Sequence, residues 1–132
     1  MRLVLDADVL IGALDGNDQH HRRARKLFRG WREQQATVTM SVVNLSEVLI
    51  APARTRSELS AAREAIAALG ITVHPPNEAI GVEAARLRAR YPISLPDAYS
   101  LATAKHTASN LVSFDQKVLR AARAESIATP SP

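Results

Sequence analysis

Short apolar runs and helix-length amphipathic segments alternate along the chain. The runs are mostly β-branched or aliphatic and lie next to turn-forming residues, which is typical of strands. Five such strands are predicted, over residues 2–5, 37–43, 71–75, 110–114 and 126–129. Because strands alternate with helices, we expect an α/β fold, a single three-layer α/β/α domain over residues 1–132 with a central, mostly parallel five-stranded sheet.

The helices between these strands are predicted from apolar spacing and from capping residues. Within residues 19–35, apolar side chains recur at i, i+3, i+4 and i+7, which gives a helix one buried face. Thr55, Asn77 and Ser94 are suitable N-cap residues, and each precedes a helical pattern. A last short helix is expected over about 116–124.

Composition narrows the class of protein and the kinds of site that it can hold. The chain has 132 residues, 46% of them hydrophobic and only 4% aromatic, which suits a globular domain with an aliphatic core. It has no cysteine, so disulfides and thiolate metal sites are excluded. The four histidines are scattered and match no metal-ligand spacing. Any bound metal would therefore be held by oxygen atoms.

The net charge and the length of the apolar runs indicate the kind of partner and the location of the protein. The net charge is +4 and the sequence pI is near 10.1, which favours an anionic partner. The N-terminus lacks a basic region followed by an apolar core, and no apolar run approaches the roughly 20 residues of a membrane span. We therefore expect a soluble, cytoplasmic protein without membrane contact.

Carboxylates follow the predicted strands at related positions. Asp6 and Asp8 come directly after the first strand, and Asp115 comes directly after the fourth. Glu47 lies about one turn into the helix that leaves the second strand, and Asp97 lies in the first turn of the helix before the fourth. In open α/β sheets, ligands bind beyond the carboxyl ends of the strands. The sequence thus predicts that four segments deliver carboxylates to one edge.

Each acid also has a simpler interpretation. Asp6 or Asp8 could cap the helix that follows, Asp115 could cap the short last helix, and Asp97 could belong to a capping box. Glu47 has apolar neighbours and could pair with an arginine. Taken together, however, clustered carboxylates repel one another unless a proton or cation intervenes. Mg²⁺ or Mn²⁺, which prefer oxygen ligands, would supply that charge.

Two families with acids on such a sheet lack necessary parts here. The stretch LDADVL resembles the strand-ending D-x-D motif of haloacid-dehalogenase-type enzymes, but we find no later acidic pair of the kind that family needs. The receiver domain of response regulators has a similar length, but it requires an aspartate at the end of the third strand. The stretch ITVHPPNE offers none there.

Four motifs distributed over the chain resemble a third family. They read LVLDADVLIGAL, SVVNLSEVLIAP, ISLPDAYSLATAKH and NLVSFDQKVL. In order and spacing they resemble the PIN domain family. The compact one-domain form resembles the VapC-type toxin ribonucleases of bacterial type II toxin–antitoxin pairs.

The resemblance assigns roles to individual residues. It implies four carboxylates that bind the metal and carry catalysis: Asp6, Glu47, Asp97 and Asp115. Asp8 stands where the family accepts Ser, Asp or Asn, which implies a supporting position beside the ligands, and Ser113 stands where a threonine is frequent. Gln116 and Lys117 occupy the region where the family often has a further acid or amide.

The resemblance also implies a function and partners. It implies a Mg²⁺-dependent endoribonuclease, with Mn²⁺ as a possible substitute, that hydrolyses phosphodiester bonds in structured RNA as the toxin of a VapBC-type pair. The implied partner is a VapB-type antitoxin whose tail occupies the acidic groove, with homodimers and larger complexes. The alternative is a PIN-like module that binds RNA or protein without cleavage. The complete set of four acids favours cleavage.

Overall fold

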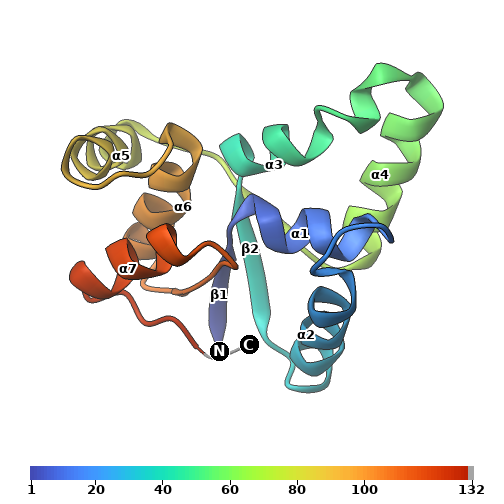
Figure 1. Ribbon diagram of the computed structural model, residues 1–132, viewed down its shortest axis with the longest axis horizontal. Helices are drawn as coiled ribbons and strands as arrows, with labels where there is room; N and C mark the ends of the chain where they lie inside the picture. The colour runs from blue at the N-terminus through green and yellow to red at the C-terminus, as the bar shows by residue number, and fades with distance from the viewer. Residues whose placement is uncertain (131–132) are drawn as a thin grey trace.

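A parallel four-stranded sheet forms the centre of the computed structural model, which describes residues 1–130 (Figure 1). The strands are β1 (Arg2–Leu5), β2 (Thr37–Ser41), β3 (Thr72–His74) and β4 (Asn110–Val112). They are ordered β3-β2-β1-β4, and all three pairings are parallel. All carboxyl ends of the strands therefore lie at one edge of the sheet.

Helices cover both faces of this sheet. They are α1 (Ala7–Leu14), α2 (His21–Glu33), α3 (Val42–Leu49), α4 (Arg56–Ala68), α5 (Glu78–Arg90), α6 (Leu95–His106) and α7 (Gln116–Ala124), with a 3₁₀ turn at Pro52–Arg54. In β1, Leu3 and Leu5 pack in one core with residues of α1 to α4, whereas Val4 packs in a second core with residues of α5, α6 and α7. This alternation confirms the predicted three-layer α/β/α architecture.

Two of the predicted strands end two residues too late. The apolar run over 37–43 is predicted as one strand, but β2 ends at Ser41, whose hydroxyl accepts a hydrogen bond from the Val43 amide at 3.2 Å and caps α3. The run over 110–114 is likewise strand only as far as Val112. In both cases the strand ends before a segment that carries a carboxylate of the acidic edge. This edge consists of Asp6, Asp8, Glu47, Asp97 and Asp115.

The predicted fifth strand is absent from the part of the chain that the structure describes. Residues 126–129 form no strand, although the Leu111 amide donates to the Ala128 carbonyl at 2.9 Å. Ser126 has a φ of 59°, and the Ile127 amide donates to Ala122 of α7 at 2.8 Å. The chain is still completing the turn out of α7, so it is not extended over enough residues for strand pairing.

A polar network joins the three helices on the face that carries α5 to α7. The Glu125 carboxylate, whose side chain is 6% exposed, accepts hydrogen bonds from the Tyr91 hydroxyl, from Arg86 at 2.7 Å and from Lys105 at 3.0 Å. Arg86 and Lys105 also donate to Glu83. Hydrogen bonds from Tyr91 and from the two cations lower the pKa of Glu125 to about 2. This network joins α5, the last turn of α6 and the residue that follows α7.

None of the helices within residues 1–130 has the length and apolar content needed to span a membrane.

Candidate active site

Asp6 lies at the centre of the acidic edge. It follows β1 directly and caps α1, because its Oδ1 atom accepts a hydrogen bond from the Ala7 amide at 3.0 Å. The capping interpretation is therefore confirmed for this residue. Yet Asp6 is only 3% exposed, far more buried than a cap requires. Unpaired carboxylates are rarely this buried, so its other contacts have to be considered.

The segment after β4 binds both aspartates of the first segment. The Ser113 hydroxyl donates to Oδ2 of Asp6 at 2.9 Å, and the Phe114 amide donates to Oδ2 of Asp8 at 3.0 Å. The Asp115 amide in turn donates to the Ser113 hydroxyl at 3.1 Å. Ser113 thus links Asp6 to the backbone of Asp115.

Asn44 connects Asp6 with the start of α6. It is completely buried on α3, one turn before Glu47. Its Nδ2 atom donates to the Pro96 carbonyl at 3.1 Å and reaches Oδ1 of Asp6 at 3.5 Å. Its Oδ1 atom is buried without a hydrogen-bond partner. The sequence prediction missed Asn44, and the only signal for it was a polar residue within an apolar helical pattern.

Asp97 and Asp115 both act as caps and both face the edge. Asp97 and Ser94 form the capping box predicted as an alternative, with two hydrogen bonds of 3.2 Å. Asp115 accepts from the Lys117 amide at 2.8 Å and caps α7. The capping interpretation thus holds for both residues. Each capping contact uses one carboxylate oxygen, so the other oxygen of each residue is available to another partner.

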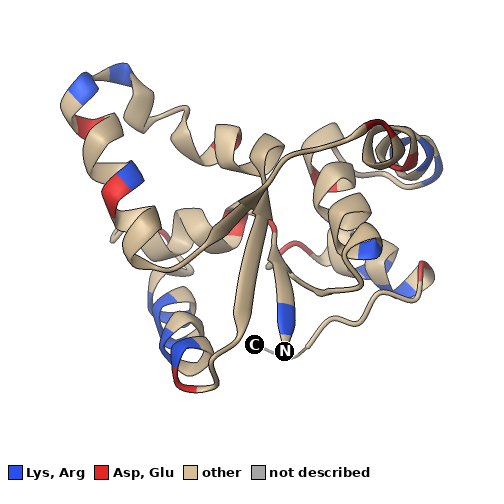
Figure 2. Ribbon diagram, turned by 180° about the vertical axis from the view of Figure 1, so that it is seen from behind, with Lys and Arg blue, Asp and Glu red and all other residues tan. Residues whose placement is uncertain are grey.

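The charges of these acids act on one another. The pKa of Asp6 is raised well above its ordinary value, first by burial and then by the charges of Asp8 and Asp97. Burial also raises the pKa of Asp8 to about 6, with a contribution from Asp115. The pKa of Glu47 is raised by burial and by Asp97. The five acids, from four segments, therefore lie in one shared negative field. Figure 2 shows acidic positions near the ends of the central strands.

The donor set fits a hard divalent cation. The five acids offer oxygen ligands, and Oδ1 of Asp8 is buried without a hydrogen-bond partner. Within residues 1–130, no three His, Asp or Glu side chains are gathered as tightly as metal ligands are. The arginine partner considered for Glu47 is also absent, since the ion pairs of this part of the chain involve only Glu83 and Glu125.

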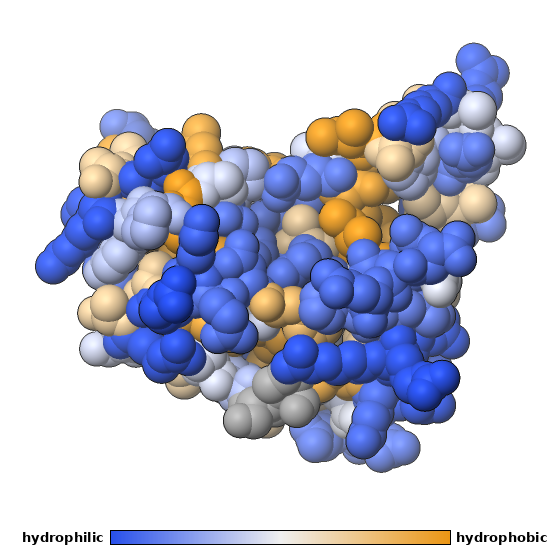
Figure 3. All heavy atoms as spheres, in the orientation of Figure 1, coloured by the Kyte–Doolittle hydropathy of each residue, from blue (hydrophilic) through white to orange (hydrophobic). Residues whose placement is uncertain are grey.

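The face of the molecule seen in Figure 3 is largely hydrophilic. In the space-filling view, apolar surface on this face is concentrated around α3 and the inner side of α4 (Figure 3). Ile50, which follows α3, is 69% exposed. Apolar surface in this view therefore lies beside α3 and α4 more than beside α2 or α7.

Comparison with known proteins agrees with this architecture. Residues 3–124 match the model of the family described as PIN domain. No curated protein sequence matches the chain.

Solved structures of similar fold cover nearly the whole chain. The FitAcB structure from Neisseria gonorrhoeae has a TM-score of 0.73 at 20% identity and covers 98% of this chain and 97% of the matched one. VapC20 of Mycobacterium tuberculosis, a sarcin–ricin loop cleaving toxin, has a TM-score of 0.74 at 19% identity over 90% and 94%. VapBC2 from Rickettsia felis, bound to a promoter DNA fragment, has 0.73 at 12% identity over 98% of each chain. At these identities the likeness concerns the fold.

Proposed function

The chain belongs to the PIN domain family, and we propose that it is a metal-dependent endoribonuclease that hydrolyses phosphodiester bonds in structured RNA. The observation that carries the proposal is that acids from four segments lie around the buried pair Asp6 and Asp8. Carboxylates that raise one another's pKa values destabilise their own charged forms. A bound cation would stabilise those charged forms.

We assign the metal to four carboxylates, those of Asp6, Glu47, Asp97 and Asp115. A bound Mg²⁺ or Mn²⁺ would offset the charge of the phosphoryl oxygens and lower the pKa of a coordinated water. The protein contributes rigidity. Ser113 and Asn44 donate to different oxygens of Asp6, so that carboxylate is restrained from two sides. The capping contacts of Asp97 and Asp115 fix their side chains in the same way.

We further propose that residues 1–132 act as one domain, as the toxin of a VapBC-type toxin–antitoxin pair. Structures of similar fold include a toxin–antitoxin complex from Klebsiella pneumoniae and VapBC2 from Rickettsia felis, which supports an antitoxin partner. The proposed assembly is a homodimer that forms a larger complex with a VapB-type antitoxin. Because the proposed substrate is RNA, we propose that the protein acts in the cytoplasm.

Cleavage of RNA by the purified, partner-free protein tests the enzymatic proposal. Total RNA is incubated with the protein in Mg²⁺, Mn²⁺ or EDTA, and new ends are mapped by sequencing. We expect cuts with either metal and none in EDTA. Asp6→Asn should abolish them, whereas Asp15→Asn, which removes the same charge from an exposed residue at the end of α1, should not.

Two results would contradict this proposal. Cleavage that persists in EDTA would exclude the metal. RNA binding without cleavage under all metal conditions would instead favour the alternative, a PIN-like module that binds RNA or protein without cutting it.

A further inference from the structure

An aromatic residue borders the acidic edge on the side of α2. Phe114 lies between Ser113 and Asp115, and its amide is hydrogen-bonded to Asp8. The guanidinium carbon of Arg23 lies 4.7 Å from the centroid of the Phe114 ring. The ring of His20 lies 4.5 Å from the same ring, centroid to centroid, with an angle of 30° between the planes. Two side chains from the start of α2 therefore pack on the residue next to Asp115.

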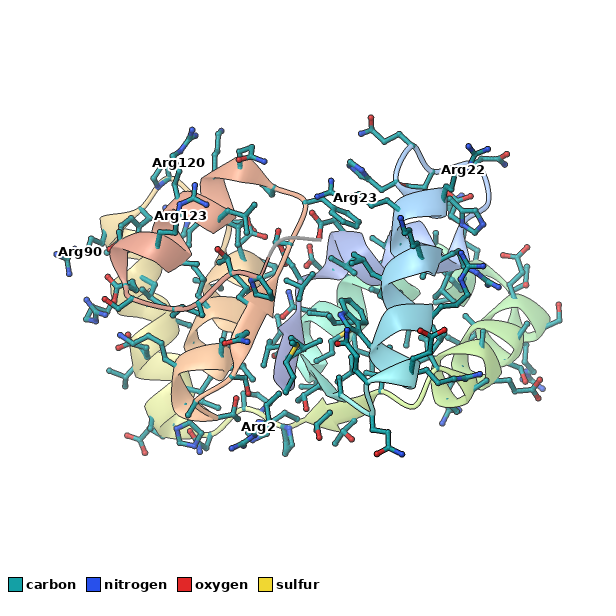
Figure 4. All side chains as sticks on the ribbon, turned by 90° about the horizontal axis from the view of Figure 1, so that it is seen from below. Arg2, Arg22, Arg23, Arg90, Arg120 and Arg123 are labelled. Atoms are coloured by element: carbon teal, nitrogen blue, oxygen red, sulfur yellow. The ribbon has the colours of Figure 1, made fainter. Side chains whose placement is uncertain are left out.

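Arg23 and its neighbour Arg22 lie on different sides of α2. Arg23 lies between α2 and the loop that leads into α7, whereas the adjacent Arg22 lies on the outer side of α2 (Figure 4). A guanidinium over an aromatic face is attracted to it electrostatically. This contact restrains the long side chain next to the acids, so less conformational entropy is lost when it binds a ligand.

The guanidinium of Arg23 is available for such a ligand. Among residues 1–130, ion pairs are formed by Arg86, Arg90 and Lys105, and all of these lie in the network around Glu83 and Glu125. Arg23 takes part in none of them, although acids lie close to Phe114. Its planar set of N–H donors matches the oxygens of a phosphate group.

An acidic edge needs a neighbouring cation if its substrate is a polyanion. The carboxylates would attract a metal but repel the phosphates on either side of the bond that is cut. We propose that Arg23, seated on Phe114, binds a backbone phosphate of the RNA strand adjacent to the cleaved bond. This inference rests on the proposed function and names a residue that positions its substrate.

The salt dependence of RNA binding measures this contact directly. Binding of a fluorescent single-stranded RNA is followed by anisotropy in EDTA, where the proposed cleavage does not run, between about 50 and 200 mM KCl. The logarithm of the affinity falls linearly with the logarithm of salt concentration, by about 0.7 for each phosphate contact in a single strand. Arg23→Gln should reduce this slope by about that amount and weaken binding.

Matched variants separate the contact from a general loss of charge. Arg22→Gln removes the same charge from the adjacent residue and should keep the wild-type slope. Arg23→Lys keeps the charge and should retain most of the slope with weaker binding, because the paired N–H donors are lost. The rise in melting temperature that Mg²⁺ produces should be equal in Arg23→Gln and the wild type, since Arg23 is not assigned to the metal.

The outcomes distinguish this inference from the proposed function. If the wild type binds and cleaves RNA but Arg23→Gln has an unchanged slope, the inference fails and the proposed function stands. A larger Mg²⁺ effect without a change in slope would show that Arg23 only neutralises the acids, which also overturns it. If Arg23→Gln is unfolded, the inference is overturned by an Arg23→Lys protein that binds RNA as tightly as the wild type. A wild type that binds no RNA in this assay overturns the inference, whereas the proposed function is overturned only by the cleavage test.

Discussion

Ser113 and Asp6, which are 107 positions apart in the chain, are joined by a hydrogen bond of 2.9 Å from the Ser113 hydroxyl to Oδ2 of Asp6. The parallel register of the sheet explains it. Leu5 of β1 lies opposite Val112 of β4, so the next residue of each strand leaves the sheet beside the other. The hydrogen bond therefore closes the acidic edge where the two strands end.

Replacing Ser113 should reveal how much stability this contact supplies. Ser113→Ala removes the donor to Asp6 and the acceptor for the Asp115 amide in a position that is 3% exposed. Leaving buried polar groups without partners costs about 1–3 kcal/mol of unfolding free energy, measurable by urea denaturation. Ser113→Thr keeps the hydroxyl and should lose less. An alanine variant as stable as the wild type would show that water replaces both contacts.

Much of the fold could be predicted because local signals and tertiary structure agree. Strand–helix alternation, the capping residues Asn77 and Ser94, and the parallel sheet are all present. The errors arise where apolar composition and conformation diverge. The apolar residues after Ser41 belong to a capped helix, and those after Ser126 follow a left-handed turn. Neither the helix cap nor the left-handed turn can be predicted from apolar content alone.

The closeness of the acids could be predicted, but the contacts that support them could not. Strand ends and motif spacing lead to the five carboxylates, because position in an α/β fold determines which residues share an edge. Asn44 and Arg23 depend on tertiary packing instead. Asn44 meets Pro96, which is 52 positions away, and Arg23 meets Phe114. No periodicity or spacing within one segment reports such contacts.

Acid should remove the stability that the network around Glu125 contributes. The pKa values of Glu83 and Glu125 are lowered to about 2, against ordinary values of 4.5. Groups with a depressed folded-state pKa contribute stability above the unfolded value and lose it as pH falls toward the folded value. We therefore expect this contribution to be complete above pH 4.5 and to be lost between pH 4.5 and about 2.

Glu125→Gln tests that origin of the pH dependence. The variant should be less stable near neutral pH by about 1.5–3 kcal/mol, the range for hydrogen bonds to charged groups. Its stability should also fall less steeply with pH over the same window. Glu64→Gln on α4, where the glutamate is exposed, serves as the control. Equal pH profiles for the two variants would mean that Glu125 does not carry the effect.

Divalent metal should stabilise the fold through the acidic edge. A ligand that binds only the folded state adds about 2.7 kcal/mol at 100 times its Kd, so Mg²⁺ or Mn²⁺ should raise the melting temperature. Asp6→Asn should abolish that rise and could increase metal-free stability, because the charge of Asp6 is disfavoured by burial and by Asp8. An unchanged metal response in calorimetric melts would remove Asp6 from the ligand set.

Asp97 offers the sharpest test, because its role as a cap and its proposed role as a ligand predict different outcomes. Its carboxylate accepts from the Ser94 amide, and its charge raises the pKa values of Asp6 and Glu47. If Asp97 only caps α6, Asp97→Asn should be nearly silent. An amide oxygen still accepts that hydrogen bond, and only a dipole contribution of about 0.3–1 kcal/mol is lost.

If Asp97 is a ligand, the same substitution keeps the shape but removes the charge that holds the ion. Cleavage and the metal-dependent rise in melting temperature should then both collapse, while the metal-free protein remains folded by circular dichroism. Asp97→Ala should additionally destabilise the fold by about 0.5–2 kcal/mol, as lost caps do. We expect the ligand outcome, since a cap alone has no need to face Asp6. An Asp97→Asn protein that folds and cuts RNA at the wild-type rate would establish the capping role instead.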